Sequence, residues 1–277
     1  MTHPSLPRFL RSAAFRRSRG GVFAVLFCEE DWMVAETLAH LRRLRPAHIL
    51  AIGRTGGLAD DTDLSTIQAD LGDRRARSEI LNTLIPELEG RWIAWQSNGE
   101  FLFYPWSETR TLGDLAQFLA DERRRILFTY ALDLYAQYLP EAAELATSEL
   151  FFDRIAYHAF PSEDRALAVF GGLGWRFEEF LPERMQQIGR PTLFRATKGL
   201  RIQPDLTFAE PDHRSVSAPW HHSPTGAMMS LRRTKRLLLA PGFVDVADRL
   251  IWHGSERFAW SSAQLLDLGF IEPGQWF

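Results

Sequence analysis

The sequence predicts an α/β fold in which a mostly parallel β-sheet is flanked by helices, with a less regular C-terminal half. Short, continuous apolar runs recur along the chain, and these are typical of strands buried on both faces. Amphipathic stretches of helical period lie between them. The composition of the 277 residues, with 45% hydrophobic and 24% charged side chains, is that of an ordinary globular protein. It excludes a disordered, collagen-like or coiled-coil protein.

The first strand–helix–strand unit starts at Val22–Cys28, a continuous apolar run that predicts a buried strand. A helix is expected over Glu29–Arg45, because apolar residues recur in it at helical spacing and acidic residues stand at its start. Pro46 ends this helix. The apolar run Ala47–Gly53 predicts the second strand, and the glycine- and aspartate-rich segment Arg54–Asp63 predicts a loop.

The alternation continues to residue 135. An amphipathic helix is expected around Ile80–Leu88, a third strand over Arg91–Gln96 and a loop over Ser97–Ser107. Thr111–Asp121 predicts a helix opened by a Thr-x-x-Asp capping box, and Arg125–Asp133 a fourth strand. Such alternation indicates βαβ units on a parallel sheet, which bind ligands at the carboxyl ends of their strands. The predicted ends are Cys28-Glu29, Gly53–Asp63 and Ser97–Glu100.

We expect one domain over residues 21–277, with a regular half at 21–135 and a less regular half at 136–277. Residues 1–20 carry five arginines, two prolines and no acidic residue. This is a poor secretory signal, and we expect a basic, loosely ordered arm. Phe9, Leu10 and Phe15 lie among these arginines, so the arm could alternatively make a peripheral membrane contact.

The composition also narrows the function. The net charge of −3 argues against general nucleic-acid binding, which needs a basic field. No uninterrupted apolar window of about 18 residues occurs, so no transmembrane segment is expected. The one cysteine, Cys28, excludes an internal disulfide framework and a Cys-rich zinc site. It fits a reducing compartment, and we expect a cytoplasmic protein. Hydrolase and NTPase motifs are absent.

Two blocks carry a family resemblance: FAVLFCEEDWMVAETLAHL at Phe23–Leu41 and RWIAWQSNGEFLFYP at Arg91–Pro105. Together with residues 111–135, and more loosely with Phe152-Asp153-Arg154 and Trp252–Leu265, they resemble family 2 glycosyltransferases of the GT-A type. The resemblance is to a bacterial subgroup that has Asn-Glu after the first strand and Asp-x-Asp-Glu-Phe after a later one. It implies a Rossmann-like GT-A fold, with a nucleotide-sugar half at 21–135 and an acceptor half at 136–277.

The sequence departs from this subgroup where the subgroup binds its metal. Cys28-Glu29 stands in place of Asn-Glu, and Ser97-Asn98-Gly99-Glu100 stands in place of Asp-x-Asp-Glu. Both metal-binding aspartates are therefore missing. A divalent cation such as Mn²⁺ or Mg²⁺ prefers anionic oxygen ligands, so we expect most of the metal affinity to be lost, name no metal ligand and consider a cation disfavoured.

Three compensations for the missing aspartates are conceivable. Glu100 could be the sole carboxylate ligand of the cation. The loop Asp60–Asp63 could supply charge from a neighbouring strand end, unless it is a solvated loop that caps the next helix. Arginines could neutralise the diphosphate directly, unless they form a surface basic run. The candidates are Arg54, Arg232, Arg233 and Arg236.

The resemblance implies binding of a nucleotide-diphosphate sugar and transfer of the sugar to a glycan or lipid-linked acceptor. Glu29 resembles the family's acidic residue near the nucleotide base, although a helix N-terminus would favour an acid there too. We also expect nucleotide-sugar contacts at Arg54, Asp61 and Ser97.

In a transfer reaction, the catalytic candidates that would accept the proton of the acceptor are Glu100 and His222. His222 could instead contact a metal or phosphate, but adjacent histidines point in different directions and make a poor metal site. A second hypothesis is a degenerate member that binds a nucleotide-sugar, a glycan or a partner protein without turnover.

Overall fold

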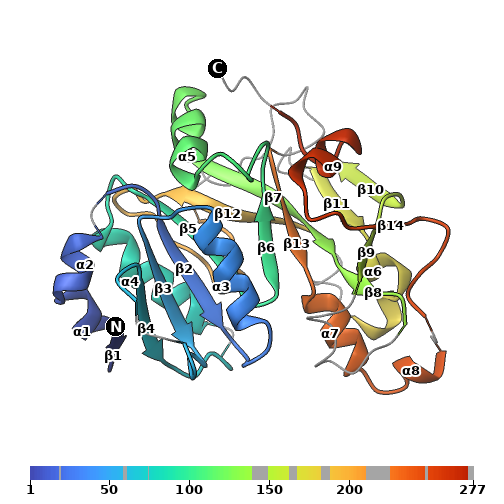
Figure 1. Ribbon diagram of the computed structural model, residues 1–277, viewed down its shortest axis with the longest axis horizontal. Coiled ribbons are helices and arrows are strands. Elements are labelled where there is room, and N and C mark those ends of the chain that lie inside the picture. The colour runs from blue at the N-terminus through green and yellow to red at the C-terminus, as the bar shows by residue number, and fades with distance from the viewer. Residues whose placement is uncertain are drawn as a thin grey trace.

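The computed structural model describes residues 1–18, 20–58, 61–73, 75–138, 149–161, 167–181, 188–209, 225–246 and 249–273 (Figure 1). The strands of its large sheet are β1 (Thr2–His3), β2 (Phe23–Cys28), β3 (His48–Gly53), β4 (Leu64–Gln68), β5 (Trp92–Ser97), β6 (Glu100–Phe103), β7 (Ile126–Asp133), β12 (Gly189–Arg195) and β13 (Gly226–Ser230). The helices that flank it are α1 (Leu6–Leu10), α2 (Ala13–Arg17), α3 (Val34–Arg43), α4 (Ala76–Glu87) and α5 (Leu112–Asp121).

The sheet is mixed, and most of its neighbouring strands are parallel. Within the described residues its order is β1-β4-β3-β2-β5-β12-β7-β13-β6. β2, β3 and β4 follow one another outward, all parallel, and β5 then returns to the other side of β2. β12 is antiparallel to both β5 and β7. The predicted α/β fold is confirmed, and the strand order reverses between β2 and β5.

Helices cover both faces of the sheet, as the residues of β2 illustrate. Val25 and Phe27 pack in one cluster with residues of α1, α2 and α4, whereas Ala24 and Leu26 pack in another with residues of α3 and α5. All four are buried, which explains the continuous apolar run. Burial also raises the pKa of Cys28 to about 12, with a smaller effect from nearby carboxylates, so this thiol stays protonated.

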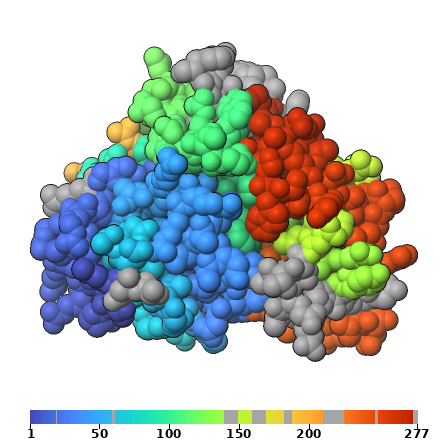
Figure 2. All heavy atoms as spheres, in the orientation of Figure 1, coloured from blue at the N-terminus to red at the C-terminus, as the bar shows by residue number. Residues whose placement is uncertain are grey.

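The second half of the chain adds smaller elements beside the sheet. β8 (Tyr135–Ala136), β9 (Leu150–Asp153) and β14 (Ser255–Arg257) form a three-stranded sheet, and β10 (Tyr157–Pro161) pairs with β11 (Leu167–Gly171). The short helices are α6 (Leu173–Arg176), the 3₁₀ turn η1 (Glu178–Phe180), α7 (Arg232–Leu238), α8 (Phe243–Val246) and α9 (Ser262–Asp267). Figure 2 shows N-terminal residues in blue on one side of the molecule and C-terminal residues in red on the other.

The prediction of a loosely ordered arm at residues 1–20 is wrong for its described residues. β1 pairs with β4 in parallel, and Ser12 caps α2 by accepting a hydrogen bond from the backbone N–H of Phe15. Phe9 and Phe15 are 0% and 8% exposed, so the two rings lie in the core and are not available to a membrane. None of the helices in the described part of the chain combines the length and apolar character that crossing a bilayer requires.

Two strands were not predicted from the sequence. β6 lies inside the loop expected at Ser97–Ser107 and starts directly after the turn at Asn98-Gly99, and β4 starts after Asp63, just beyond the loop expected at Arg54–Asp63. Because β4 is parallel to β3, the chain between Arg54 and Asp63 crosses from the carboxyl end of β3 to the amino end of β4. The predicted helix over Glu29–Arg45 is shorter than expected, since α3 begins only at Val34. Glu29 therefore lies in the turn that follows β2.

Candidate functional site

The carboxyl ends of β2 and β5 lie side by side at the point where the strand order reverses. Phe27 and Ser97 are paired across the two strands. Asn98 joins both ends: its backbone N–H donates to the carbonyl of Phe27 at 2.9 Å, and its side-chain oxygen accepts from the backbone N–H of Glu29 at 2.9 Å. Its amide nitrogen donates to the carbonyl of Trp32 at 2.7 Å. Open α/β sheets bind ligands at such a point.

Glu29 is surrounded by donors at this point. Arg232 of α7 donates to both of its carboxylate oxygens, at 2.6 and 2.8 Å. Arg77 of α4 and the Ser97 hydroxyl each donate to Oε1, at 2.8 and 2.9 Å. Burial alone would raise the pKa of Glu29, but the hydrogen bond and charge of Arg232, the charge of Arg77 and the hydrogen bond of Ser97 lower it to about 2. Glu29 is thus the ionised counter-ion of two arginines.

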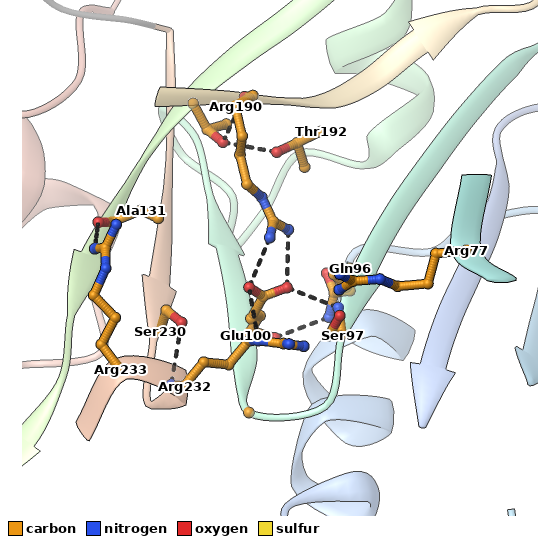
Figure 3. A network of polar contacts seen from close by, with 12 residues as sticks. Arg77, Gln96, Ser97, Glu100, Ala131, Arg190, Thr192, Ser230, Arg232 and Arg233 are labelled. Atoms are coloured by element: carbon orange, nitrogen blue, oxygen red, sulfur yellow. Dashed lines mark hydrogen bonds and ion pairs between the residues drawn. The ribbon is translucent and has the colours of Figure 1, made fainter. Parts of the chain in front are cut away.

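Glu100 starts β6 and is 2% exposed. Arg190 of β12 donates to both of its oxygens, at 2.7 and 2.8 Å, and the backbone N–H of Ser97 donates to Oε2 at 2.7 Å (Figure 3). The guanidinium of Arg190 also lies 4.4 Å from the ring centroid of Trp95, and Nε of Arg232 is 4.0 Å from Glu100 Oε1. Both carboxylate oxygens of Glu100 are therefore engaged with the protein.

Two cavities adjoin at this cluster, and Arg77 and Arg232 line both of them. The larger, of about 740 Å³, lies between the β2 end, α4 and α7, and the smaller, of about 250 Å³, lies over β5, β7 and β12. Six basic side chains line the two cavities: Arg77, Arg190, Arg232, Arg233, Lys235 and Arg236. Four acidic ones line them as well: Glu29, Glu30, Glu100 and Asp205. This surplus of positive charge suits an anionic ligand.

The larger cavity also holds aromatic and cationic groups beyond the arginine pair. Lys235 forms an ion pair with Glu30, and its ammonium lies 4.8 Å from the ring centroid of Trp32. Burial lowers the pKa of Lys235. The indole nitrogen of Trp32 is buried, and no described residue accepts its hydrogen bond. A buried donor without a partner is uncommon in folded proteins.

The residues at this point do not fit a divalent cation. The oxygens of Glu29 and Glu100 already accept from arginines, and the Ser97 hydroxyl donates to Glu29. Gly99 has a φ of +77°, and a Cβ placed on it would lie 2.7 Å from the ring of Trp32. Among the residues that can be described, no group of three or more His, Cys, Asp or Glu side chains could hold a metal.

Introducing the two aspartates of the motif that this segment resembles should therefore not create a metal site. In Gly99→Asp the side chain meets Trp32 and the backbone is held in the left-handed region, so we expect a loss of about 1–3 kcal/mol in the free energy of unfolding. The variant Ser97→Asp/Gly99→Asp should show no Mn²⁺-dependent rise in melting temperature. Ser97→Asp alone is the control, and a Mn²⁺-dependent rise in the double variant would contradict the geometry described here.

The residues predicted from the sequence do not all meet at this site. Glu29, Ser97 and Glu100 do. Arg54 follows β3, but it pairs with Asp31 at 3.8 Å, with both side chains mostly exposed, and it lines neither of these cavities.

Asp61, which the sequence predicts as a nucleotide-sugar contact, lies away from this site. It lies near the amino end of β4, at the opposite edge of the sheet from the β2 and β5 ends, and pairs with Arg42 at 3.0 Å. His222 lies outside the described residues.

The other candidate arginines lie close to the site. Arg232 and Arg236 line the larger cavity, and Arg233 is paired with buried Asp133 at 3.1 Å.

Two arginines of the site were not predicted. Arg77 and Arg190 had no local signal, because 30 of the chain's 32 basic residues are arginine and only Lys198 and Lys235 are lysine. Their role follows from the positions of α4 and β12 alone.

Comparison of the sequence with family models and with curated proteins gives no match. The case for a function therefore rests on the chemistry of the site.

Proposed function

We propose that this chain is a glycosyltransferase-like protein of the GT-A type whose basic cavity binds a nucleotide-diphosphate sugar without a divalent cation. One observation carries the proposal: Arg77 and Arg232 lie at the switch point of the sheet, beside the position where the related motif would hold its metal. Two guanidinium groups can neutralise a diphosphate and bind its oxygens in a bidentate way, which is the electrostatic work of the cation.

The larger cavity supplies the remaining contacts of such a ligand. Lys235 and Arg236 add positive charge to its wall, and Trp32 contributes an aromatic ring. A nucleoside diphosphate has both the negative charge and the flat aromatic group that this wall complements.

If the protein turns over, an acceptor hydroxyl attacks the anomeric carbon of the donor. The new carbon–oxygen bond forms as the bond to the diphosphate breaks, and Arg77 and Arg232 stabilise the negative charge that develops on the leaving group. The hydroxyl proton passes to a general base. Glu100 is a poor base in this arrangement, because Arg190 and the backbone N–H of Ser97 engage both of its oxygens.

That engagement of Glu100 favours a second candidate function, in which the same cavity binds a nucleotide-sugar, a glycan or a partner protein without transferring the sugar. Both candidates share the anion site and differ only in turnover. The acceptor, a glycan or a lipid-linked molecule in the first candidate, and a cytoplasmic location stay predictions from the sequence.

A panel of nucleoside diphosphates and their sugar conjugates tests the proposal. At least one uridine or guanosine compound should raise the melting temperature, in EDTA as well as in Mn²⁺. No shift with any compound in either condition would reject nucleotide-sugar binding. Release of free nucleoside diphosphate from the conjugate that binds, followed with and without candidate acceptors, then separates transfer from binding alone.

A further inference from the structure

The donors that a diphosphate would need are already used by a carboxylate of the protein. Both terminal nitrogens of Arg232 donate to Glu29, and Arg77 donates to the same side chain. A carboxylate and a phosphate present the same pair of acceptor oxygens to a guanidinium fork. They cannot occupy one fork together.

We infer that Glu29 is an internal competitor of the anionic ligand, and that the diphosphate binds by displacing the Glu29 carboxylate from Arg232 and Arg77. The inference rests on the proposed function and assigns Glu29 a role other than reading the nucleotide base. Arg77 and Arg232 line both cavities, and Glu29, which is paired with both of them, lines the larger one.

The local structure allows such an exchange. Glu29 lies in the turn between β2 and α3, outside both regular elements, and its backbone is held independently by Asn98. Its side chain is 23% exposed, so the carboxylate can turn toward water without being buried elsewhere. Among the described residues, the Ser97 hydroxyl is the one neutral side chain that donates to it, at 2.9 Å.

Glu29→Gln tests the inference with inorganic pyrophosphate as the probe, in EDTA, by isothermal titration calorimetry. The amide removes the competing charge and leaves both arginines for the probe, so we expect pyrophosphate to bind about tenfold more tightly or better than to the unchanged protein. Asp31→Asn is the matched control. It removes the same charge two residues away, where Asp31 pairs with exposed Arg54, and should change the affinity less than twofold.

Equal or weaker binding to Glu29→Gln, with binding by the unchanged protein intact, overturns the inference and leaves the proposed function standing. Absence of pyrophosphate binding to both proteins overturns the proposed function itself. Should Glu29→Gln not fold, Ser97→Ala decides the question, since it removes one hydrogen bond to Glu29 and keeps both arginines. Its affinity for pyrophosphate should rise by about threefold, and a fall would count against displacement.

Discussion

Glu100→Ala should lower the free energy of unfolding by about 3–5 kcal/mol, as expected when one partner of a buried ion pair is removed. Glu100 is 2% exposed, and its loss leaves the guanidinium of Arg190 and the backbone N–H of Ser97 without their acceptor. Nε of Arg190 is already buried without a partner among the described residues. Chemical denaturation of the variant measures the loss directly.

A matched ion pair on the surface gives the control. Glu256 pairs with Arg154 at 3.8 Å, with the two side chains 36% and 48% exposed, so Glu256→Ala should cost less than about 1 kcal/mol. Adding Arg190→Met to Glu100→Ala should recover much of the stability, because no buried charge is then left unpaired. A cost below about 1 kcal/mol for Glu100→Ala would mean that the ion pair does not hold β6 and β12 together.

Arg232→Gln should weaken the binding of a nucleoside diphosphate by about a hundredfold or more. The residue belongs to both cavities and supplies the only two-nitrogen fork aimed at Glu29 within the described residues. Losing one partner of a desolvated, charged contact costs about 2–5 kcal/mol in binding. Calorimetric titration of the variant, with its fold checked by circular dichroism, provides the measurement.

Arg54→Gln is the natural comparison for Arg232→Gln. The sequence predicts both arginines as diphosphate ligands, but Arg54 is 65% exposed and lines neither of these cavities. Its loss should leave the affinity within about twofold. Similar losses in the two variants would show that general positive charge, and not the placement of Arg232, binds the ligand.

The strands that could be predicted are those whose signal is local. β2, β3, β5 and β7 are apolar runs, and the capping box of α5 is formed by Thr111 and Asp114 as expected. β4 is not an apolar run, because two of its buried residues, Ser65 and Thr66, are polar. Their hydroxyl groups bond to His48 and Thr2, at 3.0 Å each. The partners that satisfy these buried hydroxyl groups are distant in sequence, so the local sequence does not predict the strand.

The missed strand explains the main error in the predicted site. Without β4, the acidic loop ending at Asp63 looks like a continuation of the carboxyl end of β3, and Asp61 seems to face the ligand. Because β4 is parallel to β3, Asp61 lies near the amino end of β4, away from the carboxyl end of β3, and it pairs with Arg42 instead. Glu29, Ser97 and Glu100 were found because each lies in a segment that directly follows a predicted strand. Arg77 and Arg190 come from elements brought in by tertiary packing.

The most direct test of the account compares the affinity for uridine and guanosine diphosphates in EDTA and in Mn²⁺. The central claim is that Arg77 and Arg232 replace the cation at the switch point of the sheet. It predicts that a nucleoside diphosphate binds in EDTA, with a dissociation constant that Mn²⁺ changes less than about threefold. Binding that appears only when Mn²⁺ is present would contradict the claim.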